Sequence, residues 1–154
     1  MMEFNTKESV EALVPHTGKM FLLDRITSYS WDTLEITTEV DISESSMFYD
    51  EELGGVPVWI SFEYMAQSIS ALSGAYGKSR NEEPKVGFIM SVSQFKAFRN
   101  VFKSGEVVKL KMKQTIRVDM AVTFDGQAYV GDELVATATV NTVEVPDPKK
   151  AVGL

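Results

Sequence analysis

Cysteine is absent from this chain of 154 residues, and histidine occurs only once, as His16. Without cysteine the protein forms neither disulfide bonds nor zinc sites built on thiolates, and a reducing compartment is compatible with this composition. The sequence also lacks a metal-ligand cluster, a nucleotide-binding fingerprint and a phosphate-binding glycine loop. We therefore expect a protein that uses neither a metal nor a cofactor.

Basic residues and long apolar runs are scarce as well. The chain carries 22 acidic and 15 basic residues, for a net charge of −7. This balance argues against a general affinity for nucleic acid or for an anionic membrane. No apolar run approaches the roughly 18 residues that a transmembrane helix requires, and the N-terminus lacks the pattern of a secretion signal. We expect a cytoplasmic protein that binds neither a membrane nor nucleic acid.

One predicted helix organises the rest of the chain. From Phe62 on, its larger apolar residues recur at steps of three and four positions: Phe62, Met65, Ile69, Leu72 and Tyr76. This spacing places them on one face of a helix whose other faces carry small residues, so the helix should be buried on nearly all sides. The stripe and the preceding Trp59 are expected to belong mainly to the core. Glu63 lies in the first turn, where burying a carboxylate is costly and requires an explanation.

The remaining segments predict strands and loops. Six segments are rich in β-branched and aromatic residues and read as strands: 21–29, 33–40, 85–95, 106–118, 120–124 and 133–145. A short helix over residues 7–13 comes first, with Asn5 or Thr6 as its N-cap and Glu8 in a capping box. Residues 43–55 predict an acidic loop, and Asp125-Gly126-Gln127 predicts a tight hairpin turn.

Consecutive strands with short connections favour an antiparallel sheet, so the predicted class is α+β. We expect one domain over residues 1–154, with its core at about 13–145 and a frayed tail over 146–154. A helix that is apolar on more than one face requires the sheet to curve around it. A curved sheet on one helix leaves edges that a second chain would cover, which predicts a homodimer.

Three separated motifs resemble one enzyme family. Residues 14–26, with Pro15-His16 near their start, are similar to the opening of the 3-hydroxyacyl-acyl-carrier-protein dehydratases of fatty-acid synthesis. Residues 63–67, with Pro57 six positions before Glu63, resemble the start of the family's central helix. Residues 94–106 resemble its Phe-Arg-Arg strand and the turn that follows. The resemblance implies the hotdog fold, in which a curved antiparallel β-sheet wraps around one long central helix.

The chain departs from the common members of this family in the loop before the helix. Those members carry a Gly-His-Phe-Pro-Gly loop whose histidine is the catalytic base, whereas residues 48–55 contain no histidine. Their Met-Pro-Gly is replaced by Val56-Pro57-Val58, followed by Trp59. These features, together with Pro15-His16, resemble more closely the dehydratase-like hotdog proteins that are encoded with aryl-polyene pigment synthesis.

The dehydratase resemblance implies roles for two residues. Removing water from a 3-hydroxyacyl thioester requires a base for the C2 proton, an acid for the leaving hydroxyl and donors for the developing oxyanion. His16 is the only side chain of a type that titrates near neutrality, and it is expected to be the base. Glu63, expected to be largely removed from water, would be the acid. The first amides of the helix, from about Trp59 to Phe62, would hold the thioester oxygen.

Other residues are expected to hold the substrate and its carrier. Four residues near the start of the helix would line the acyl pocket: Pro57, Trp59, Ile60 and Gln67. Tyr49 and Asp50 are alternatives for the missing loop histidine, since they lie roughly where it would fall. Lys96, Arg99 and Lys103 form a local positive patch on an acidic chain. Such a patch would guide an acidic acyl carrier protein that bears a phosphopantetheine thioester.

Two other functions stay open at this point. A hotdog thioesterase also places a carboxylate on its central helix, and it would release a free acid in place of an enoyl thioester. A non-catalytic acyl-binding subunit would bind the carrier tightly without forming a product. Structural interpretations of the same residues also exist, because a histidine after a proline is commonly a turn residue. A glutamate in a first turn also stabilises the helix dipole by about 0.3–1 kcal/mol.

Overall fold

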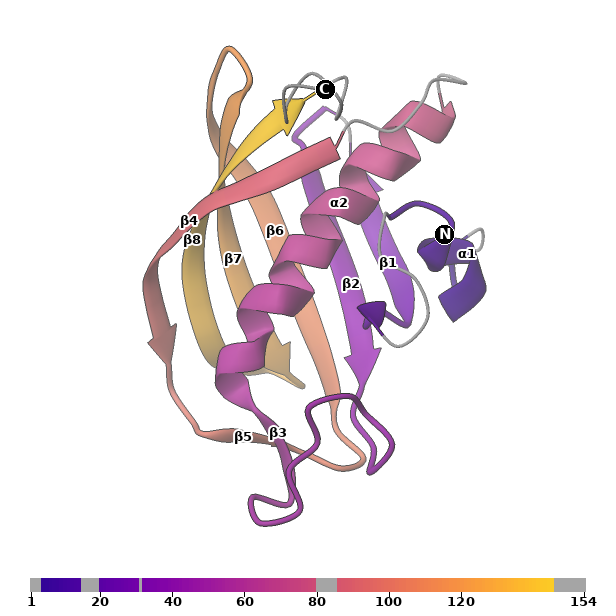
Figure 1. Cartoon of the computed structure of the whole chain (residues 1–154), viewed down its shortest axis with the longest axis vertical. Coiled ribbons are helices and arrows are strands. Elements are labelled where there is room, and N and C mark those ends of the chain that lie inside the picture. The colour runs from indigo at the N-terminus through magenta and orange to yellow at the C-terminus, as the bar shows by residue number, and fades with distance from the viewer. Residues whose placement is uncertain (1–3, 15–19, 31, 80–85, 146–154) are drawn as a thin grey trace, which may run out of the picture.

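A computed structural model describes residues 4–14, 20–30, 32–79 and 86–145 of the chain. Its elements follow in the order α1 (Lys7–Glu11), β1 (Arg25–Ser30), β2 (Glu35–Asp41), β3 (Gly55–Pro57), η2 (Val58–Ile60), α2 (Ser61–Ser79), β4 (Val86–Ala97), β5 (Val101–Lys103), β6 (Val107–Val118), β7 (Ala121–Val130) and β8 (Glu133–Val145) (Figure 1).

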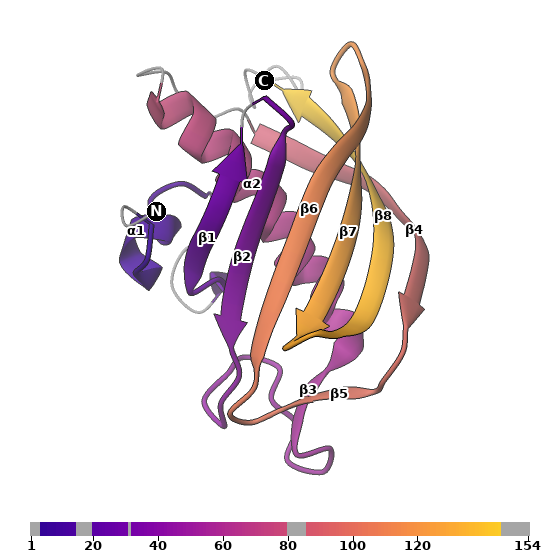
Figure 2. The same cartoon turned by 180° about the vertical axis from the view of Figure 1, so that it is seen from behind.

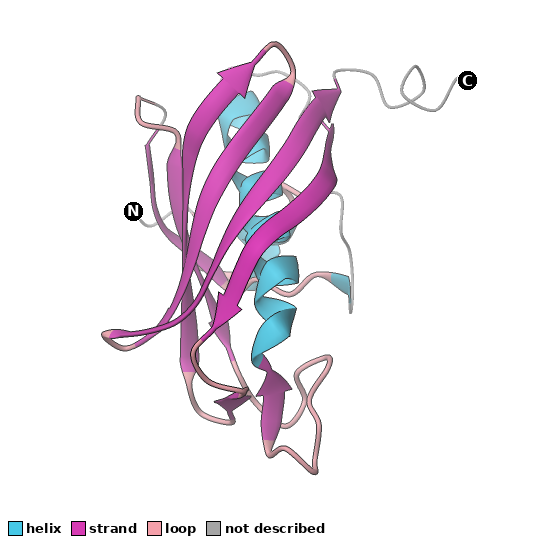
Figure 3. Ribbon diagram, turned by 90° about the vertical axis from the view of Figure 1, so that its left-hand side faces the viewer, coloured by secondary structure: helices cyan, strands magenta, loops and turns pink. Residues whose placement is uncertain are grey.

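Six strands form one antiparallel sheet in the order β1-β2-β6-β7-β8-β4, and β3 pairs with β5 in a separate two-stranded sheet. The main sheet curves around α2, which lies along its concave side as a second layer (Figures 1 and 3). Seen from behind, no other described element covers the outer face of the sheet (Figure 2). This arrangement is the hotdog fold, which confirms the predicted α+β class.

Alternating burial sets the register of the strands. In β2 the buried residues are Ile36, Thr38 and Val40, while the residues between them are partly exposed. The Thr38 hydroxyl lies 2.7 Å from the Ser68 hydroxyl of α2, so this buried face meets the helix. A shift of one residue would turn the whole apolar set of the strand toward solvent.

Helix α2 is buried mainly on the side that meets the sheet. That side carries six buried residues: Tyr64, Met65, Ser68, Ala71, Leu72 and Ala75. Three members of the predicted apolar stripe are only half-buried: Phe62, Ile69 and Tyr76. Met65 and Leu72 of the stripe lie in the core and Ile69 packs against it, so the prediction is confirmed for only part of the stripe. Within one chain the sheet and the N-terminal segment leave one face of the helix less covered.

The N-terminal segment packs against α2 and β1. Thr6 caps α1, since its hydroxyl accepts the Ser9 N–H at 3.2 Å and the Ser9 hydroxyl accepts the Thr6 N–H at 3.3 Å. A capping box exists as predicted, but Ser9 completes it in place of Glu8. Further on, Gly74 of α2 lies against Leu13, where a Cβ on the glycine would come within 2.0 Å of the Leu13 carbonyl oxygen.

The prediction of a tight turn at Asp125-Gly126-Gln127 is wrong. These residues lie inside β7 and pair with both neighbouring strands. A Cβ at Gly126 would lie 2.7 Å from the Met65 sulfur of α2, so the glycine makes room for the helix. The two-residue turns lie at Asp119-Met120 and Gly131-Asp132, where Asp119 and Gly131 have φ of +55° and +59°.

The ends of the predicted strands also differ from the structure. The first strand begins at Arg25 and not at residue 21, because the Leu22 N–H donates to the Gln67 side chain instead of to a neighbouring strand. Strands β3 and β5 have only three residues each and were not predicted. Within the described residues no helix combines the length and the apolarity that crossing a membrane requires.

Candidate functional site

The start of α2 is held in place by the small sheet in front of it. Pro57 pairs with Val101, and the Val58 N–H donates to the Asn100 carbonyl at 3.0 Å. Gly55 is needed in this pairing, since a Cβ there would come within 1.9 Å of the Phe102 carbonyl oxygen. The loop before α2 and the loop after β4 therefore fix the first turn of the helix together.

Glu63 and Gln67 meet one turn apart on α2. The Gln67 Nε2 donates to Glu63 Oε1 at 3.2 Å and to the Met20 carbonyl at 2.8 Å, while Gln67 Oε1 accepts the Leu22 N–H at 2.8 Å. Gln67 is fully buried, and Glu63 is half-buried. We call this set of three bonds the Gln67 clamp. It ties the carboxylate to the backbone of residues 20–22.

Two expectations for this helix start differ from the structure. Glu63 is half-buried within one chain and not largely removed from water. The Ser61 N–H donates to the Val58 carbonyl, so this amide is not free for a thioester oxygen as predicted for the amides of Trp59 to Phe62. The amide is used because the 3₁₀ turn η2 runs directly into α2 and supplies a carbonyl partner.

Trp59 lies on the surface, which contradicts the expectation that it belongs mainly to the core. It is 58% exposed, and its ring stacks on Phe62 with centroids 6.3 Å apart and planes 14° apart. Ile60 beside it is 2% exposed and packs in the core. Of the four residues predicted to line the acyl pocket, only Trp59 is exposed, since Ile60 and Gln67 are buried and Pro57 is partly buried.

The loop before β3 contains the two alternatives to a loop histidine. The Asp50 carboxylate accepts the N–H groups of Glu52 at 2.9 Å and Leu53 at 3.3 Å, and its backbone pairs with Gly55. Tyr49 is partly buried against the core. Asp50 therefore stabilises the turn of its own loop, a common use of an aspartate side chain.

The predicted positive patch is weaker than its sequence implies. Arg99 forms ion pairs with Glu106 and, at 3.3 Å, with Glu133, and its Nε donates to the Val101 carbonyl at 2.9 Å. Its charge is therefore balanced within the chain. Lys96 and Lys103 are both exposed and have no ion pair among the described residues.

His16 lies outside the described residues, as does the rest of residues 15–19. Within the described ranges, no group of three or more histidine, aspartate or glutamate residues is arranged to hold a metal ion. The sequence motifs identified Glu63 and Gln67, which are four positions apart, but did not predict the hydrogen bond between them. That spacing on a helix is the signal that would have found it.

Comparisons with known proteins place the chain in a family. A family model described as ApeP-like, ApeP dehydratase, matches residues 8–153. The 3-hydroxyacyl-acyl-carrier-protein dehydratase FabZ of Chlamydia trachomatis is 24% identical over 141 residues, which are 90% of this chain and 91% of that protein.

Solved structures share the fold at low identity. One is a chain of the dehydratase heterocomplex ApeI:P from Xenorhabdus doucetiae, with a TM-score of 0.84 and 24% identity over 94% of this chain and 95% of that one. Another is a hypothetical thioesterase of Streptococcus pneumoniae solved with coenzyme A, with a TM-score of 0.61 and 14% identity over 80% of this chain and 86% of that one. Such likenesses show the fold alone.

Proposed function

Because this chain belongs to the ApeP-like family of dehydratases, we propose that it removes water from a 3-hydroxyacyl thioester on an acyl carrier protein. The product is the 2-enoyl thioester, in fatty-acid-like or aryl-polyene synthesis. The observation that carries the proposal is the Gln67 clamp, which holds the Glu63 carboxylate in the first turn of α2. The reaction needs no cofactor, since it transfers protons and releases water without any net oxidation or reduction.

The proposed mechanism assigns one proton transfer to each of two residues. His16 takes the proton from C2, the C2–C3 double bond forms, and the C3–O bond breaks as Glu63 gives its proton to the leaving hydroxyl. Water leaves, and a proton returns from the histidine to the glutamate before the next turnover. General acid–base steps of this kind contribute about 10²–10⁴-fold each.

Chain connectivity supports the pairing of these two residues. His16 stands four residues before Met20, whose carbonyl is held by Gln67. The histidine and the clamp therefore belong to one short stretch of the sequence. We propose that the Gln67 clamp serves both residues, since it binds Glu63 directly and anchors the segment that follows His16.

We propose that the stacked rings of Trp59 and Phe62 form a wall for the acyl group. Their geometry leaves one large aromatic face in solvent at the start of the helix. An acyl chain or an aryl group covering this face would remove apolar surface from water at about 25 cal/mol per Å². Pro57 fixes the approach to this wall through its pairing in β3.

We propose an acyl carrier protein and a second copy of this chain as partners. Lys96 and Lys103 remain as exposed cations that an acidic carrier can meet, whereas Arg99 is balanced by its ion pairs. The half-buried face of α2 and the open edge of β4 both favour a homodimer. In such a dimer, one active site can combine His16 of one chain with Glu63 of the other.

Mass spectrometry of carrier-bound 3-hydroxyacyl thioesters, incubated with the full-length protein, tests the reaction. We expect the acyl group to lose the mass of one water molecule, and we expect Glu63→Gln to slow this loss by about 10²–10⁴-fold. The matched control is Glu52→Gln, which alters an exposed carboxylate in the loop before β3.

Full activity of His16→Ala would contradict the role of this histidine as the base. Release of the acyl group as a free acid would identify a thioesterase, and an unchanged panel with tight carrier binding would identify a binding subunit.

A further inference from the structure

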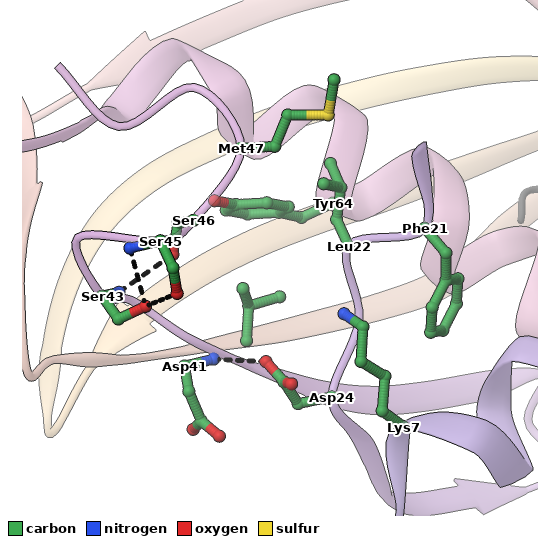
Figure 4. Close-up of a pocket in the computed structure, with 11 residues that line it drawn as sticks. Lys7, Phe21, Leu22, Asp24, Asp41, Ser43, Ser45, Ser46, Met47 and Tyr64 are labelled. Carbon is green, nitrogen blue, oxygen red and sulfur yellow. Dashed lines mark hydrogen bonds between the residues drawn. The ribbon is translucent and has the colours of Figure 1, made fainter. Parts of the chain in front are cut away.

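A cavity of about 710 Å³ lies apart from the Trp59 wall. It opens between α1, the segment before β1, the end of β2, the turn after it and the first turn of α2 (Figure 4). None of Pro57, Trp59, Ile60, Glu63 and Gln67 lines it. Its volume is in the range of small-molecule sites, which are about 300–1,000 Å³.

Tyr64 supplies a buried donor to this cavity. The residue is 3% exposed, and Figure 4 shows its hydroxyl directed toward the turn that carries Ser45 and Ser46. Among the described residues no group accepts or donates a hydrogen bond at this hydroxyl, although a buried polar group without a partner is costly. Burial and the nearby Asp24 raise the pKa of Tyr64, so the hydroxyl stays protonated and can donate.

Further donors surround the same space. The hydroxyls of Ser43 and Ser45 lie 2.8 Å apart and share one hydrogen, so one of them keeps a free O–H. The Ser46 hydroxyl accepts the Ser43 N–H at 2.9 Å, which leaves its own hydrogen available. The Lys7 ammonium lies 5.0 Å from the centre of the Phe21 ring and has no ion pair within the part of the chain that the structure describes.

Each acidic group at the rim has one oxygen engaged. The Asp24 carboxylate accepts the Asp41 N–H at 2.7 Å through Oδ2, and the Asp41 carboxylate is paired with Arg25 through Oδ2. The cavity therefore presents donors from Tyr64, Ser46 and Lys7 beside one remaining oxygen of Asp24 and one of Asp41. Apolar side chains of Leu22, Val40 and Met47 supply the remaining wall.

We propose that this cavity binds a small amphipathic carboxylate, a ligand beyond the thioester of the proposed reaction. The carboxylate accepts hydrogen bonds from Tyr64, Ser46 and Lys7, and its apolar part packs against the wall formed by Leu22, Val40 and Met47. Leu22 also gives its N–H to the Gln67 clamp, so the ligand and the clamp share one backbone segment.

Calorimetric titration of the full-length protein with octanoate tests this site. We expect saturable binding that Tyr64→Phe weakens by about tenfold or more, since the variant removes one hydrogen bond to a charged group. Tyr64→Phe should keep the melting temperature of the unliganded protein or raise it, because the lost hydroxyl has no partner. Lys7→Gln should also weaken binding, and 1-octanol should bind more weakly than octanoate.

The control is Glu52→Gln, which alters an exposed carboxylate outside the cavity and should bind octanoate like the unaltered protein. Loss of octanoate binding in Glu63→Gln with full retention in Tyr64→Phe would move the ligand to the acyl site and overturn the proposal. No saturable binding, or equal affinity for octanol and octanoate, would overturn it as well. None of these outcomes depends on dehydratase activity, so the two proposals fail separately.

Discussion

Among single residues, Gln67 explains most about how the site is built. The Nε2 of its side-chain amide donates to a carboxylate and to a backbone carbonyl, and its Oε1 accepts a backbone N–H. A hydrophobic residue of similar size fits the space but supplies none of these bonds. Gln67 therefore acts as a positioning residue for Glu63 and for the backbone of residues 20–22.

The variant Gln67→Leu should lose both stability and activity. We expect the free energy of unfolding to fall by about 1–3 kcal/mol, because the Leu22 N–H and the Met20 carbonyl lose their partner. Urea unfolding measures this change, with Ser70→Ala on the same helix as the control. A positioning role further predicts a lower kcat and an altered pH profile. Unchanged kinetics in a destabilised Gln67→Leu protein would limit Gln67 to a structural role.

Tyr64 predicts a loss of stability at alkaline pH. Burial raises its pKa above the ordinary tyrosine value of 10.0, which applies to the unfolded chain. Above pH 10 the unfolded state loses this proton while the folded state keeps it, so stability is complete below pH 10 and falls as the pH rises. One such proton lowers the free energy of unfolding by about 1.4 kcal/mol between pH 9 and pH 11.

Chemical unfolding of the unaltered protein and of Tyr64→Phe at pH 9 and pH 11 measures this term. The other tyrosines and the lysines contribute equally to both proteins, so the difference between them isolates Tyr64. Equal losses in the two proteins would show that Tyr64 ionises in the folded state as easily as in the unfolded state.

At the scale of elements, two glycines lie where another segment packs closely against the backbone. Gly126 of β7 accommodates the Met65 side chain of α2, and Gly74 of α2 accommodates the Leu13 backbone. Neither glycine has a positive φ, so close approach and not backbone conformation accounts for both. The helix is in this way held between the sheet on one side and the N-terminal segment on another.

The variant Gly74→Ala sets two effects against each other. Alanine favours a helix over glycine by about 1 kcal/mol, which alone would stabilise the protein. A Cβ at this position, however, comes within 2.0 Å of the Leu13 carbonyl oxygen, so the N-terminal segment must shift. We expect a net loss of about 1–2 kcal/mol, measured by urea unfolding. A stabilised Gly74→Ala protein would mean that the segment at Leu13 moves away at little cost.

At the scale of the whole molecule, a single chain leaves one side of its fold uncovered. The sheet covers only part of α2, and β4 stands at an edge of the main sheet with 12 residues. An edge of this length commonly pairs with another chain or is protected from doing so. The half-buried residues Phe62, Ile69 and Tyr76 lie on the helix face that a second copy would cover.

Light scattering on an eluting size-exclusion peak measures the predicted dimer. We expect about twice the chain mass of 17.1 kDa for the unaltered protein and the mass of one chain for Ile69→Glu, because a charge in an apolar interface is not solvated. The control is Ile116→Glu at the tip of the β6–β7 hairpin, where the side chain is 59% exposed. Circular dichroism verifies that both variants are folded. A monomeric unaltered protein would contradict the homodimer.

Local patterns were sufficient for most of the fold. Richness in β-branched and aromatic residues predicted most of the long strands. The three- and four-residue spacing predicted α2, because one buried face imposes a fixed period on a helix. The order of three short motifs predicted the hotdog fold and the dehydratase family, and both predictions are confirmed. The Gly131-Asp132 turn was not predicted, although such a pair between strands is a hairpin signal.

Contacts between distant segments decided the rest. Gly126 has the sequence context of a turn and lies within a strand, because the helix presses on it from 61 positions earlier in the chain. Arg99 has the sequence context of a free cation and is balanced by Glu106 and Glu133. The three-residue strands β3 and β5 are too short to show a period, and the cavity beside Tyr64 joins four separate parts of the chain. Residue type and spacing report which face of an element is apolar, whereas only packing fixes what each face meets.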